Sequence, residues 1–171
     1  MVDWDEQIKA HLVWIWGQEE GFMKRGTEGM LVVTDKRIAF ITKTNMSYRI
    51  HDVHSVRQLK RFKEGENVFR PLEGYGIKHL NDDIQKSTEN FDIPFNQILD
   101  ITSEVKRWAT LLRVKINLGI KTKTYKFSIV RGWVKYPLKD PIEFQHVDWF
   151  PVINLYEDSQ EEGTHKRNTI H

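Results

Sequence analysis

Apolar and polar residues alternate along two stretches in the second half of the chain, as they do in strands that cover a core on one face. The apolar residues that share a face are Leu112, Val114, Ile116 and Leu118 in the first stretch and Tyr125, Phe127 and Ile129 in the second. Gly119 stands between the stretches, where a tight turn can reverse the chain. The pattern predicts an antiparallel hairpin over 112–129 whose polar face lies in water.

Short apolar segments separated by turn residues fill the region from 20 to 43. They predict three antiparallel strands, over 22–23, 30–33 and 38–41. Alternation returns at 91–98, where Pro94 confines the expected strand to the edge of a sheet or to a bulge.

The first residues of the chain have the spacing of a helix. Asp3 and Glu6 fit a capping box, and Gly17 is a suitable stop. The residues that recur on one helical face are Trp4, Ile8, Leu12 and Ile15. Leu12, Trp14 and Trp16 also alternate as in a strand, so the strand remains an alternative.

A second helix is expected near the other end. Asp140, Pro141 and Glu143 form a helix start, and Pro151 predicts a kink or a restart. The residues from 159 to 171 are polar enough to form a disordered tail.

The segment from 44 to 90 is irregular and rich in charge. Connections of this length are either functional or partly disordered. Within it, Tyr48 to Val56 offers the alternative of a fourth strand.

Composition bounds the class of protein. The 171 residues suit one domain, and 39% apolar residues suffice for a core. The 26 basic and 24 acidic residues nearly cancel, and there is no cysteine for a disulfide, a thiolate nucleophile or a zinc site. Charged Asp3, Asp5 and Glu6 stand where a signal peptide would be basic and then apolar, so we expect a cytoplasmic protein, and peripheral association with a membrane stays open.

One motif resembles a known family. The run Gly29-Met-Leu-Val-Val-Thr-Asp-Lys-Arg-Ile-Ala-Phe-Ile41 is similar to the second and third strands of pleckstrin-homology-like (PH-like) and GRAM-like domains. Phe91-Asp-Ile-Pro-Phe-Asn-Gln-Ile98 resembles a later strand of the same family. The resemblance implies a mainly β fold, a PH-like β-sandwich or open barrel of about seven strands with a C-terminal capping helix. An extra N-terminal helix would precede it, in one domain over 1–158 with an insertion at about 44–90.

Catalytic and metal chemistry find little support. His51, Asp52 and His54 would diverge on a strand, where positions three apart face opposite sides, and no third histidine lies nearby. The chain lacks a G-x-S-x-G elbow and a phosphate-binding glycine loop. We therefore expect a binding module without enzymatic activity, metal or cofactor.

The resemblance also implies a binding site for anions. In PH-like folds the loop between strands one and two lies beside the loop between strands three and four, and together they bind anionic ligands. The residues that this transfer assigns here are Lys24, Arg25, Lys43, Lys60, Arg61, Phe62 and Lys63. An anionic membrane or an acidic protein would then be the partner, with Phe62 inserted among headgroups; the alternative is a solvated loop with Phe62 in the core.

A second basic surface is expected on the polar face of the hairpin. Ten bases and one acid, Glu104, lie between 103 and 139. The bases that would share the sheet face are Arg113, Lys115 and Lys126, and the alternative is a solvated face that prevents aggregation.

Two other functions stay open: protein interaction or self-assembly through 44–90, and binding of single-stranded nucleic acid by Trp108 and Trp133, which the near-neutral charge disfavours.

Overall fold

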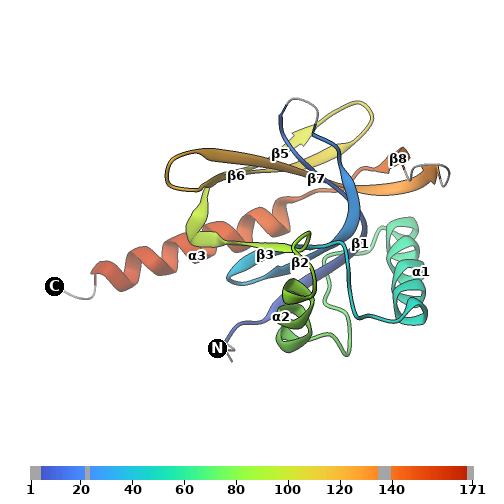
Figure 1. The fold of residues 1–171 in the computed structure, drawn as a ribbon, viewed down its shortest axis with the longest axis horizontal. Helices are drawn as coiled ribbons and strands as arrows, with labels where there is room; N and C mark the ends of the chain where they lie inside the picture. Colours follow the sequence, from blue (N-terminus) through green and yellow to red (C-terminus); the bar gives the residue numbers. More distant parts are fainter. Residues whose placement is uncertain (1–4, 22–23, 135–139, 169–171) are drawn as a thin grey trace.

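The strands of the computed structural model, which describes residues 5–21, 24–134 and 140–168, pair into one antiparallel sheet (Figure 1). The strands are β1 Ile8–Glu19, β2 Thr27–Thr34, β3 Arg37–Ile41, β4 Phe91–Pro94, β5 Ile98–Val105, β6 Thr110–Asn117, β7 Thr122–Val134 and β8 Asp140–Gln145. The helices are α1 Tyr48–Glu64, α2 Ile77–Lys86 and α3 Phe150–Asn168, with a 3-10 turn η1 at Phe95–Gln97. The strand order is β4-β3-β2-β1-β7-β6-β5, and β8 pairs with β7. A mainly β chain with a C-terminal helix is confirmed.

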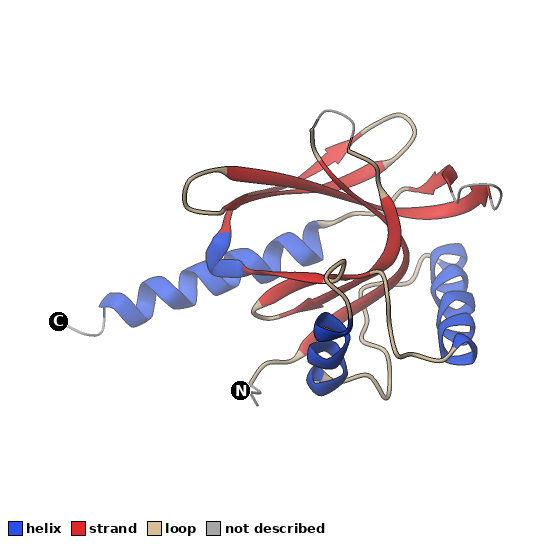
Figure 2. Cartoon of the chain, in the orientation of Figure 1, coloured by secondary structure: helices blue, strands red, loops and turns tan. Residues whose placement is uncertain are grey.

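The sheet curls into two halves that enclose the main core, and α3 runs along the side where the halves open (Figure 2). Trp149 and Val152 of this region are fully buried in that core. The Trp149 indole also donates from Nε1 to Thr110 O over 3.1 Å. These contacts hold the start of α3 against β6.

The expected N-terminal helix is wrong, because this segment is the central strand β1. Its ladder with β2 shifts register between Leu12 and Ile15, where Trp14 has a φ of 58°. The resulting bulge turns both Leu12 and Ile15 into the main core, although they are three residues apart. Their spacing therefore imitates a helical face.

The 44–90 segment completes the unpaired edge of β1. β7 pairs with β1 only from Ile15 onward, so the earlier residues have β2 on one side and no strand on the other within the described chain. There His11 N donates to Arg70 O over 2.9 Å, and His54 Nε2 donates to His11 O over 2.8 Å. Gln58 bonds both Val13 N and Val13 O, at 2.9 and 3.0 Å. Helix α1 and Arg70, in the segment that follows it, thus take the place of a neighbouring strand.

Most of 44–90 is ordered as two helices, so the alternative of a strand over 48–56 is wrong. Ser47 caps α1 by accepting from Ile50 N, and Gly65 ends it with a φ of 68°. Leu80 of α2 packs on the outer side of β1 to β3 together with Val13, Val32 and Ile41. The apolar runs of β2 and β3 are continuous because both faces of the sheet are covered where β1, β2 and β3 lie.

The hairpin of β6 and β7 is confirmed, as are the strands β2 and β3 and the edge position of β4. The expected strand at 22–23 lies outside the described residues. Leu118 is not part of the buried face, since β6 ends at Asn117 and Leu118 is half exposed in the turn.

The C-terminal helix begins ten residues later than expected. Asp140 to Gln145 form β8, and α3 starts at Phe150, whose N–H donates to Asp148 Oδ1 over 2.9 Å. Pro151 falls in the first turn, where a missing N–H removes no helical bond. The expected tail from 159 continues α3 to Asn168.

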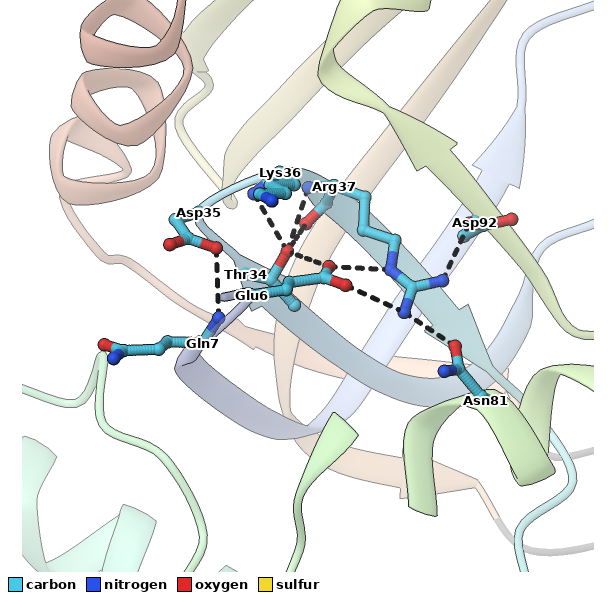
Figure 3. A network of polar contacts seen from close by, with 8 residues as sticks. All are labelled: Glu6, Gln7, Thr34, Asp35, Lys36, Arg37, Asn81 and Asp92. Carbon is cyan, nitrogen blue, oxygen red and sulfur yellow. Dashed lines mark hydrogen bonds and ion pairs between the residues drawn. The ribbon is translucent and has the colours of Figure 1, made fainter. Parts of the chain in front are cut away.

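Arg37 joins four segments through its guanidinium and the turn beside it (Figure 3). It donates from Nε to Glu6 Oε1 at 2.8 Å, from Nη1 to Asp92 Oδ2 at 3.1 Å and from Nη2 to Asn81 Oδ1 at 2.7 Å. Thr34 Oγ1 donates to the same Glu6 oxygen at 2.6 Å and accepts from Arg37 N at 2.9 Å. The network ties the start of β1, β4 and α2 to the β2–β3 turn.

Replacing Arg37 tests this network. We expect Arg37→Met to lower the free energy of unfolding by about 3 kcal/mol, because Glu6 and Asp92 would keep their charges without a cation. Lys36→Met is the matched control on the same turn, with an expected change within about 0.5 kcal/mol since Lys36 is exposed. Urea unfolding measures both, and equal losses in the two variants would contradict a stabilising role for the network.

Candidate functional site

The loop between β1 and β2 presents two of the predicted site residues, Lys24 and Arg25. Gln18 Nε2 donates to Lys24 O over 2.7 Å. The Trp16 indole lies so close to Gly26 that a Cβ there would overlap the ring, which explains the glycine. These contacts hold the loop in place at the end of the sheet.

Two acids of β1 and its loop connect these bases to the β6–β7 hairpin. Glu19 pairs with Lys24 at 3.6 Å through Oε2 and with Lys123 at 3.7 Å through Oε1. Glu20 N donates to Thr124 O over 2.8 Å, and Glu20 Oε2 lies 3.2 Å from Arg113 Nη2. The β1–β2 loop and the start of β7 therefore form one surface.

The face predicted to be basic is of mixed charge. Arg113 lies opposite Lys126 across β6 and β7, an arrangement in which like charges repel. Glu104 of β5 lies 3.9 Å from Lys126, and Asp100 is the cross-strand partner of Lys115. A hydrogen bond from the Lys106 ammonium lowers the pKa of Glu104 and keeps its carboxylate charged. Neighbouring strands thus supply the acids that the local sequence lacks.

The excess of positive charge lies at the margin of this face. We call the group of Lys24, Arg25, Lys121 and Lys123 the basic rim. Lys121 and Lys123 belong to the turn between β6 and β7 and the start of β7, at the left of Figure 1, and Lys24 and Arg25 belong to the β1–β2 loop. Glu19 links the two parts through Lys24 and Lys123. Only Glu19 and Glu20 oppose these bases within the loop and the adjoining end of β1.

The tip of the same turn carries two aliphatic side chains. Ile120 is fully exposed, at 103% of its reference area, and Leu118 is 42% exposed. The alternating pattern of the hairpin did not predict this exposure of either residue, because it placed Leu118 on the buried face and gave Ile120 no role. The signal that identifies them is their position beside Gly119, which adopts a φ of 86° in the turn.

Lys43 lies in the segment after β3, at the end of the sheet where the β1–β2 loop also lies, because Met30 pairs with Ile41. Its ammonium pairs with Glu89 at 3.3 Å, and both side chains are exposed. Asn90 Oδ1 accepts from Lys43 N at 3.0 Å and fixes the backbone there.

The remaining predicted residues, Lys60, Arg61, Phe62 and Lys63, lie on another surface. Phe62 packs against the main core and lines a small hollow with Arg131 of β7, which is the alternative that the sequence left open. Arg131 lies six positions along β7, about 20 Å of strand, from Tyr125, the partner of Glu19. The structure therefore divides the predicted set over two surfaces.

The outward face of α1 is the second of these surfaces. Val53 and Val56 are exposed there, at 46% and 67%. The bases that share or flank this face are Arg49, Arg57, Lys60 and Lys63. We call these six residues the α1 face.

The tryptophans give limited support to stacking on nucleic acid. Trp108 is half exposed, but its ring contacts Phe144 edge-on at 5.2 Å. The side chain of Trp133 lies outside the described residues.

Of the two histidines of α1, His54 acts in packing. Because the segment is helical, His51 and His54 do not diverge as on a strand, yet His54 is buried and bonds the backbone of His11. Among the described residues no three His, Asp or Glu side chains gather to hold a metal ion.

None of the described helices combines the length and apolar character needed to cross a bilayer. Comparisons with family models, with curated proteins and with solved structures found no match to this chain.

His11 is a buried neutral base beneath α1 and α2. Its Nε2 lies 3.2 Å from Met30 Sδ, and its Nδ1 has no hydrogen-bond partner in the described chain. The ring meets His54 and Tyr75 edge-on. Burial, followed by the charges of His54 and His51, lowers the pKa of His11 to about 3.

This shift predicts acid sensitivity. The unfolded chain binds a proton at His11 below about pH 6.5, whereas the folded chain does so only near pH 3, so stability falls as pH drops between these values. We expect the protein to lose about 2 kcal/mol more than the His11→Leu variant between pH 7 and pH 5. Urea unfolding across this range measures the difference, and parallel pH profiles would contradict the assignment.

Proposed function

We propose that this chain is a non-enzymatic docking module that binds anionic lipid membranes through the basic rim. The observation that carries the proposal is the joining of the β1–β2 loop to the β6–β7 hairpin by Glu19, which gathers Lys24 and Lys123 on one carboxylate. Arg25 follows Lys24 in the loop, and Lys121 precedes Lys123 by two residues. Each base near an anionic membrane contributes about 1 kcal/mol, so the rim supplies weak, reversible docking.

We also propose that the chain belongs to the PH-like and GRAM-like class. Seven strands in the order β4-β3-β2-β1-β7-β6-β5, followed by a helix after the last strand, support this assignment. Thr34 and Arg37, which belong to the family-like motif, have a structural use here because both bind Glu6. The resemblance assigns anion binding to the β1–β2 loop, where Lys24 and Arg25 lie.

A second candidate function is protein interaction through the α1 face. The exposed Val53 and Val56 favour it, since adjacent aliphatic side chains on a helix suit a partner of matching shape. The charges of the α1 face would select an acidic protein. Variants on this face serve as the control below.

Vesicle flotation tests the membrane proposal. We expect the protein to float with vesicles of phosphatidylserine and phosphatidylcholine and to remain behind with phosphatidylcholine alone, with binding that weakens as salt rises. The rim variant Lys24→Gln, Arg25→Gln, Lys121→Gln and Lys123→Gln should bind anionic vesicles at least tenfold more weakly. Removing Lys24 and Lys123 also leaves the Glu19 carboxylate without these two cations, so its negative charge repels the anionic lipids.

The matched control removes four charges from the α1 face: Arg49→Gln, Arg57→Gln, Lys60→Gln and Lys63→Gln. Its binding should stay within twofold of the parent. Equal recovery with both kinds of vesicle would refute membrane docking, and a loss confined to the control would move the site to α1.

A further inference from the structure

The β6–β7 tip exposes Leu118 and Ile120 on either side of Gly119. Single exposed aliphatic residues are common on protein surfaces and need no explanation. Here two lie together at the end of a projecting turn; Lys121 follows directly and Lys123 two residues later. An apolar tip followed by two lysines is complementary to a target that is anionic at its surface and apolar beneath.

Three backbone N–H groups of the tip have acceptors within the turn. Leu118 N donates to Lys121 O at 2.9 Å, Gly119 N to Asn117 Oδ1 at 2.9 Å and Ile120 N to Leu118 O at 3.3 Å. Irregular backbone enters lipid only at high cost when its N–H groups lack acceptors, and these three have them. The same bonds fix the turn before binding, so little conformational entropy is lost on insertion.

We infer that the tip inserts Leu118 and Ile120 into the acyl region of an anionic bilayer while the basic rim stays among the headgroups. The inference rests on the proposed function and names the part of the membrane that the tip reaches. A protein pocket would also accept an aliphatic tip, but it would match Lys121 and Lys123 only with acids placed around its mouth, whereas an anionic bilayer presents negative charge above an apolar layer over its whole surface. The long lysine stems can lie along the apolar layer while their ammonium groups remain in the headgroup layer.

A serine double variant separates insertion from charge attraction. Leu118→Ser with Ile120→Ser keeps every base of the rim, and we expect it to bind anionic vesicles at least tenfold more weakly than the parent. Val53→Ser with Val56→Ser is the matched control on the α1 face and should change binding less than twofold. Both pairs are exposed, so urea unfolding should stay near the parent for both.

A label at the tip reports depth directly. The chain has no cysteine, so Ile120→Cys gives one attachment point for an environment-sensitive dye, and Val56→Cys gives the control. On anionic vesicles the dye at 120 should shift to the blue and be quenched by lipids brominated on the acyl chain. The dye at 56 should show neither change.

The outcomes distinguish the inference from the proposed function. If the rim variant loses binding while the serine tip variant binds as the parent and the dye at 120 is not quenched, the tip does not insert and electrostatic docking stands. If rim and tip variants both bind as the parent, docking and insertion both fail. Loss of binding in both variants with quenching at 120 alone supports the inference.

Discussion

The guanidinium of Arg37 is the contact on which the arrangement of the chain most depends. It joins Glu6, Asn81 and Asp92, residues 31 to 55 positions away in the sequence, at one end of the β2–β3 turn. Carboxylates with little exposure need both a cation and hydrogen bonds, and Glu6 has both through Arg37 and Thr34. The strand that begins the fold, the edge strand β4 and the helix α2 thereby take their positions from one side chain.

A second constraint acts at the centre of the sheet, where β1 bulges at Trp14 and lacks a strand along part of one edge. The polar groups of His11 and Val13 would be buried there without partners. Arg70 O and the side chains of His54 and Gln58 provide those partners. The 44–90 segment is therefore a part of the fold that the bulged strand requires, and Leu80 of α2 extends the same cover over the outer face.

The parts of the fold that local pattern determines could be predicted, and the parts that tertiary contacts determine could not. Strands β6 and β7 alternate because one face meets water, and β2 and β3 end at turn residues. In contrast, the bulge gives Leu12 and Ile15 a helical spacing although they belong to a strand. Helix α1 buries the polar residues His54 and Gln58 instead of an apolar stripe, so the sequence lacks the apolar periodicity that predicts a helix. Asp140 and Pro141 have the chemistry of a helix start, but pairing with β7 makes them an edge strand.

The candidate site shows the same division between local and tertiary information. The bases of 103–139 are evident in the sequence, but their neutralisation depends on acids from β1 and β5 that pairing brings beside them. Glu20 pairs with Arg113, Glu104 is shared by Lys106 and Lys126, and Asp100 is the cross-strand partner of Lys115, so these acids offset much of the positive charge of the sheet face. Lys121 lies in the turn beyond the end of β6, next to the exposed Ile120, whereas Lys123 shares the Glu19 carboxylate with Lys24. The remaining positive charge and the exposed Ile120 therefore occur together. Their coincidence follows from the turn's projection past its neighbours, which also makes it the part of the hairpin best able to reach another surface.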